Sequence, residues 1–74
     1  MLGIFKKEAE KVWREIDHYH YFMEYYFASA REREQVGDLE GRDRLNEEAY
    51  KQYAFLKKAC KKYKMLTGKT VRVA

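Results

Sequence analysis

The sequence predicts an all-α fold, in which two long helices form an antiparallel hairpin followed by a short extended C-terminal tail. The 74 residues include no proline and only four glycines, so long helices can run unbroken. Apolar residues recur at alternating intervals of three and four in both halves, which is typical of a helix lying along a partner helix. A single glycine–aspartate pair interrupts this pattern near the middle. The short length indicates one domain spanning residues 1–74.

The first helix is predicted over residues 3–36. At 1.5 Å per residue it would be about 50 Å long. Trp13, His20 and Phe27 widen its apolar stripe on one flank. The stripe itself consists of Phe5, Ala9, Val12, Ile16, Tyr19, Met23, Tyr26 and Ala30.

The turn is predicted over residues 37–41. Gly37 suits the left-handed conformation that ends a helix, and Asp38 suits the cap that begins the next one. Gly41 leaves two possible starts for the second helix, at Asp38 or only near Asp43. We place this helix at residues 42–67 and the extended tail at residues 68–74.

The second helix carries its own apolar stripe and ends at Thr67 and Gly68. A short break between two long helices predicts that they pack antiparallel. In this register Met23 lies near Tyr53, and Val12 lies near Tyr63, with Ile16 near Cys60 between them. The second stripe consists of Leu45, Ala49, Tyr53, Leu56, Cys60 and Tyr63.

Residues 18–27, here called the aromatic girdle, are aromatic on nearly every side of the first helix. Tyr21 and Tyr25 are expected to point away from the second helix, and Phe22 toward one edge. One neighbouring helix cannot cover such a surface. Pairing of two hairpins into a dimeric four-helix bundle is the favoured solution. One alternative is that a different protein covers this surface. The other is that the chain is a monomer with exposed tyrosines. The predicted interface consists of Trp13, His20, Tyr21, Phe22, Tyr25, Tyr26, Phe27, Tyr50 and Phe55.

The charge is distributed unevenly along the chain. Residues 1–48 hold all twelve acids and eight bases, whereas residues 49–74 hold eight bases and no acid. Lysines three and four apart form a band along the second helix, as a phosphate-tracking surface would. The alternative is that early acids of the first helix, from Glu8 to Asp17, neutralise this band. The candidate polyanion-binding residues are Lys57, Lys58, Lys61, Lys62, Lys64, Lys69 and Arg72.

The residue content argues against catalysis, a cofactor and a small-molecule substrate. Ser29 is the only serine and Cys60 the only cysteine, and no glycine-rich phosphate loop occurs. Glu15 and His18 have the spacing of bundle metal ligands. However, His18 is expected to point outward, and the facing stretch of the second helix is rich in lysine. No metal site is therefore predicted.

The cellular setting expected from the sequence is the cytoplasm. A lone cysteine cannot form an internal disulfide. No run approaches the ~20 apolar residues that a membrane-spanning helix needs. Leu2, Ile4 and Phe5 either begin the core stripe or touch a membrane surface.

These features predict a non-enzymatic helical interaction module that binds itself or another protein, and that inhibits or scaffolds another macromolecule. The alternative is an accessory protein that binds nucleic acid without sequence preference, because lysine rather than arginine predominates in the band. The brevity of the chain and its many tyrosines and lysines also resemble small accessory proteins of phages and mobile elements. That resemblance implies action on a host factor.

Overall fold

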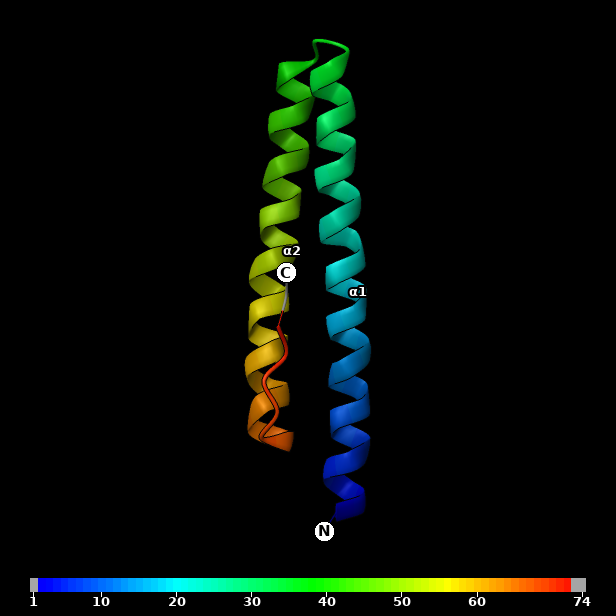
Figure 1. The fold of residues 1–74 in the computed structure, drawn as a ribbon, viewed down its shortest axis with the longest axis vertical. Helices are drawn as coiled ribbons and strands as arrows, with labels where there is room; N and C mark the ends of the chain where they lie inside the picture. The colour runs from blue at the N-terminus through cyan, green and yellow to red at the C-terminus, as the bar shows by residue number, and fades with distance from the viewer. Residues whose placement is uncertain (1, 73–74) are drawn as a thin grey trace.

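A computed structural model describes the backbone of residues 2–72 and the side chains of residues 6–72. Helix α1 spans Leu2–Gln35 and helix α2 spans Leu39–Thr67, and the two pack antiparallel along their length (Figure 1). The hairpin measures 54 × 16 × 14 Å. The predicted all-α hairpin is confirmed, and the described residues contain no strand. The expectations for the side chains of Leu2, Ile4 and Phe5 lie outside the described residues.

Helix α1 ends in a Schellman motif at Gly37. The amide of Gly37 donates to the carbonyl of Glu34 at 3.1 Å, and the amide of Asp38 donates to the carbonyl of Arg33 at 2.9 Å. Gly37 has a φ of 81°, a left-handed conformation that costs glycine no steric strain. The predicted end of the first helix is thus correct to within one residue.

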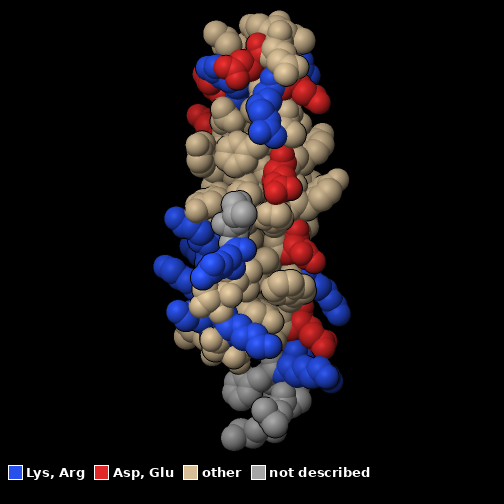
Figure 2. Space-filling view, in the orientation of Figure 1, with Lys and Arg blue, Asp and Glu red and all other residues tan. Residues whose placement is uncertain are grey.

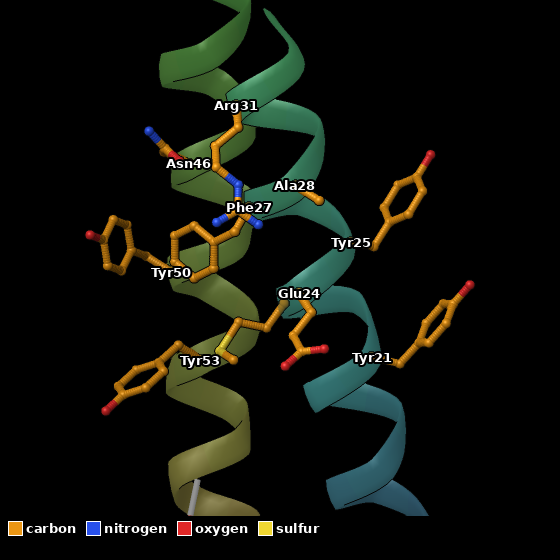
Figure 3. A pocket seen from close by; sticks show the side chains of 10 residues that line it. Tyr21, Glu24, Tyr25, Phe27, Ala28, Arg31, Asn46, Tyr50 and Tyr53 are labelled. Carbon is orange, nitrogen blue, oxygen red and sulfur yellow. The ribbon is translucent and has the colours of Figure 1, made fainter. Parts of the chain in front are cut away.

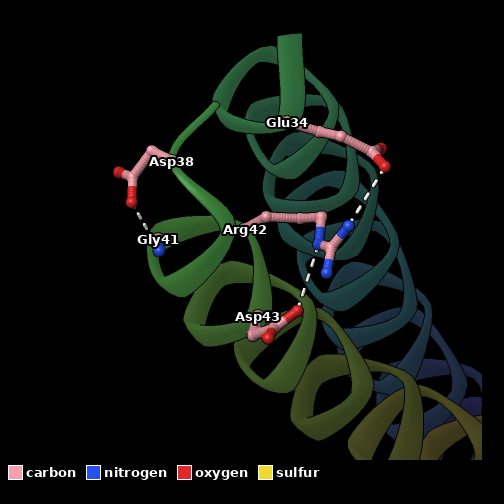
Figure 4. A network of polar contacts seen from close by, with 5 residues as sticks. All are labelled: Glu34, Asp38, Gly41, Arg42 and Asp43. Carbon is pink, nitrogen blue, oxygen red and sulfur yellow. Dashed lines mark hydrogen bonds and ion pairs between the residues drawn. The ribbon is translucent and has the colours of Figure 1, made fainter. Parts of the chain in front are cut away.

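Helix α2 begins at Leu39, three residues before the predicted start at residue 42. Asp38 caps it, because its carboxylate accepts a hydrogen bond of 2.9 Å from the amide of Gly41 (Figure 4). A Cβ at position 41 would collide with that carboxylate. Gly41 therefore belongs to the first turn of α2, where it admits the cap, and not to the loop.

The guanidinium group of Arg42 ties the two helices together beside the turn. It lies 3.1 Å from Glu34 on α1 and 3.1 Å from Asp43 on α2 (Figure 4). Both carboxylates are largely exposed, so we expect these contacts to fix the turn geometry more than they stabilise the fold.

The core is a narrow seam between the two helices. Val12 and Leu56 are fully buried. Nearer the turn, the buried residues of the seam are Ala30 and Ala49. Small side chains there let the backbones approach closely. The other buried members of the seam are Ile16, Met23 and Ala59.

Three pairs of aromatic rings across the seam agree with the predicted register. Ring centroids lie 5.4 Å apart for Trp13 and Tyr63, 5.5 Å for Tyr19 and Phe55, and 5.4 Å for Phe27 and Tyr50. These pairs flank the seam and shield it from water at its edges.

Helix α2 ends at Thr67, as predicted. Gly68 adopts a φ of 74°, and its amide donates to the carbonyl of Lys64 at 2.7 Å. Residues 69–72 form no helix or strand and turn back along the hairpin (Figure 1), so that Val71 packs against the core. The sequence predicts an extended tail but not this contact.

Candidate interaction surface

One face of the hairpin carries an open groove of about 920 Å³ between two rows of tyrosines. Tyr21 and Tyr25 project from α1 on one side, and Tyr50 and Tyr53 project from α2 on the other (Figure 3). Each pair is three or four residues apart and therefore lies on one side of its helix. Tyr21 and Tyr50 are 65% and 63% exposed, so both rows present ring surface to solvent.

The floor of this tyrosine groove combines apolar and charged side chains. Phe27, Met23 and Ala28 supply its apolar part. Glu24 and Arg31 lie between the two rows of tyrosines (Figure 3). Aromatic rings, methionine and arginine are enriched in surfaces that bind another protein.

His20 lies one helical turn before Glu24, and the two side chains are in contact. Its Nε2 lies 3.3 Å from the Glu24 carboxylate. The Glu24 side chain is 65% exposed and lines the groove.

The tyrosine groove gathers four of the nine predicted interface residues: Tyr21, Tyr25, Phe27 and Tyr50. The other five lie elsewhere on the hairpin. Trp13 packs on Tyr63 nearer the open end and is 44% exposed. Phe55 stacks on Tyr19 at 5.5 Å.

Phe22 and Tyr26 form a second aromatic cluster beside the groove, and His20 reaches the groove only through Glu24. The Phe22 ring lies 4.8 Å from His18 and 6.3 Å from Tyr26. Both Phe22 and Tyr26 are half-buried. Ring contacts also join this cluster to one rim of the groove, because the Tyr21 ring lies 5.3 Å from Phe22 and the Tyr25 ring lies 5.6 Å from Tyr26.

The structure places Tyr53 differently from the sequence-based prediction. The apolar spacing predicts it on the buried stripe of α2, yet its side chain is 39% exposed and lines the groove. Its neighbour Gln52 is half-buried instead, and Ala59 is more buried than Cys60, so the inward face of α2 is shifted by one residue from the predicted stripe. The spacing also places Tyr53 opposite Met23, and both residues line the groove. The predicted burial is wrong, but the predicted neighbour is right.

Arg31 and Asn46 also line the groove, and the sequence does not predict them there. Both look like ordinary polar positions of an exposed helix face. The only signal in the sequence is their spacing, because Arg31 follows Ala28 by three residues and Asn46 precedes Tyr50 by four.

The basic band of α2 remains open to solvent. Its members from Lys57 to Arg72 are all exposed, and Figure 2 shows Lys and Arg side chains gathered over the lower part of α2. Among the described side chains, no salt bridge joins this band to the acids of α1. Lys57 instead places its Nζ 4.9 Å from the centroid of the Tyr53 ring.

Cys60 is half-buried and packs against the core. Burial raises the pKa of its thiol, so the nearby lysines do not make it a reactive thiolate. Glu15 and His18 do not form part of a metal cluster. Within residues 6–72, no group of three or more His, Cys, Asp or Glu side chains has the geometry to hold an ion.

Alkylation of Cys60 is expected to be several-fold slower in the folded protein than in urea at pH 8.5, because folding raises the pKa of the thiol and favours its protonated form. The contribution of this shift to stability is fully present below the unfolded-state pKa and is lost as the pH rises through the higher folded-state pKa. Thiol modification rates with and without urea measure the effect. Faster alkylation of the folded chain would instead indicate an activated thiol.

No helix in the described part of the chain has the length and apolar character needed to cross a membrane. Comparison with protein-family models, with curated proteins and with solved structures finds no match to this chain.

Proposed function

We propose that this chain is a helical protein-interaction module that self-associates through the tyrosine groove, forming a dimeric four-helix bundle. The observation that carries this proposal is the exposure of Tyr21, Tyr25 and Tyr50 on one face. Tyrosine offers a large rigid apolar surface with a polar tip, and it is enriched where proteins bind one another.

The thinness of the core supports the same proposal. Only seven hydrophobic residues are buried within the described hairpin, and four of them are Ala or Val. A single core in a chain of this size supplies only about 3–5 kcal/mol. Covering the groove adds apolar burial that the isolated hairpin lacks. The remaining aromatic surfaces, around Phe22 and around Trp13, are then available to bind and either inhibit or scaffold another macromolecule.

Substituting both Tyr25 and Tyr50 by glutamate is expected to abolish self-association. Each change places a charge in a surface that dimerisation would desolvate, which costs several kcal/mol in a well-packed interface. Both rings are largely exposed, so helix content by circular dichroism should be retained. Sedimentation equilibrium from micromolar to millimolar concentration measures the dissociation constant.

Met65→Glu is the matched control, because Met65 is 88% exposed and lies outside the groove. This variant should associate like the wild type. A wild-type chain that stays monomeric at millimolar concentration and binds no hydrophobic dye would refute the proposal.

A second candidate function is sequence-independent binding of nucleic acid by the basic band of α2. The observation that favours it is that the described residues from 57 to 72 include seven bases and no acid. Their charges face solvent, most of them along one helix, where they can follow a phosphate backbone.

A further inference from the structure

The floor of the tyrosine groove carries a self-complementary charge pattern. Glu24 and Arg31 are seven residues apart on α1, with Ala28 between them, so all three lie on one face of the helix (Figure 3). Among the described side chains, Glu24 pairs only with His20 of its own helix, and Arg31 forms no ion pair. One end of the floor is therefore acidic and the other basic.

We infer that the occupant of the groove is a second copy of this chain, whose α1 lies antiparallel to the first about a two-fold axis beside Ala28. This inference rests on the self-association proposed above. A two-fold axis there places Glu24 of each copy against Arg31 of the partner subunit, so two equivalent ion pairs form at once. Ala28 has the small side chain that lets two helices approach at the axis.

Charge along the hairpin favours this arrangement over the other symmetric one. Two hairpins can also face each other with both turns at the same end. That packing would set two basic ends side by side, each with the seven bases and no acid of residues 57–72. Like charges in contact oppose association. The antiparallel arrangement instead moves the basic ends to opposite ends of the particle.

The turn end provides the matching negative charge. Residues 29–48 hold seven acids and four bases, and Figure 2 shows acidic side chains close to the turn. In the antiparallel pair, each turn lies toward the start of the partner subunit's basic band.

The two arrangements differ in length. The hairpin is 54 Å long, and Ala28 lies only about 12 Å from the turn at 1.5 Å per residue. An antiparallel dimer centred on Ala28 would therefore be about 80 Å long. A dimer with both turns at one end would keep the 54 Å length of the hairpin. Small-angle X-ray scattering of the dimer distinguishes the two lengths.

Charge reversal tests the pairing directly. Glu24→Arg or Arg31→Glu alone turns two attractive contacts into two repulsive ones, and each is expected to weaken self-association about tenfold or more. The double variant should recover wild-type affinity to within about threefold. An equimolar mixture of the two single variants should form heterodimers, because each then meets opposite charge. Glu10→Arg, the same charge change outside the groove, is the control and should leave the dimer intact.

The outcomes separate this inference from the proposed function. A wild-type monomer at every concentration would overturn both. A wild-type dimer of about 54 Å, or one that the single reversals do not weaken, would overturn the antiparallel pairing alone. The antiparallel pairing would also be overturned if the single reversals weaken self-association and the double variant, Glu24→Arg with Arg31→Glu, does not restore it.

Discussion

Leu56→Ala is expected to destabilise the hairpin by about 2–5 kcal/mol. The side chain of Leu56 is fully buried in the seam with Val12 and Ile16, and removing it leaves a cavity that two straight helices cannot collapse to fill. A chain of this size has only about 3–5 kcal/mol to lose from its core. The variant should therefore be largely unfolded at about 37 °C.

Urea unfolding followed by circular dichroism measures this loss. The measurement should be made at several protein concentrations, because self-association would add stability that depends on concentration. Met65→Ala on the same helix is the control, since its side chain is 88% exposed. It should change stability by no more than about 0.5 kcal/mol. Equal losses in both variants would contradict a core centred on Leu56.

The ends of the helices could largely be predicted because the chemistry that sets them is local. Gly37 and Gly68 adopt the left-handed conformation that their positions indicate, and Asp38 caps α2. Of the two predicted starts of α2, the earlier one at Asp38 fits and the later one does not, because the first turn of the helix includes Gly41. Its missing Cβ leaves the space that the Asp38 carboxylate occupies, and a sequence pattern does not contain that information.

The apolar spacing predicts the seam but not how deeply each member is buried. Val12, Ile16 and Met23 are buried as expected, whereas Tyr53 lies at the edge. A repeat of three and four residues identifies a stripe about two side chains wide, so it does not decide which side chain of each turn enters the gap. In α2 the inward face is shifted by one residue, so that Gln52 is more buried than Tyr53 and Ala59 is more buried than Cys60.

The candidate site could be predicted as a region but not as a shape. An excess of aromatic residues over what one helix can cover is visible in residues 18–27. The sequence does not show that Tyr21 and Tyr25 line a groove whereas Phe22 and Tyr26, in ring contact with them, pack beside it. The position of Glu24 and Arg31 inside the groove follows from tyrosines on both helices, which only the folded hairpin brings together.

Neutralising the basic band is expected to reduce nucleic-acid affinity by about a hundredfold at about 50 mM salt, if that surface tracks phosphates. The variant replaces Lys58, Lys61, Lys62 and Lys64 by glutamine, which preserves helix propensity and much of the side-chain length. All four are exposed, so the fold should be unaffected. Each phosphate contact contributes about 0.9 to the slope of log affinity against log salt, so loss of four contacts should flatten the slope by about 3.6.

The matched control removes four bases from α1 by changing Lys6, Lys7, Lys11 and Arg14 to glutamine. These side chains are also exposed, and the change in net charge is the same. Fluorescence anisotropy with a random-sequence duplex, measured across salt concentrations, compares the two variants. If the band is the binding surface, the α2 variant loses far more affinity than the α1 variant. Equal losses would mean that net charge alone attracts the nucleic acid, and a wild-type affinity that does not change with salt would exclude phosphate tracking altogether.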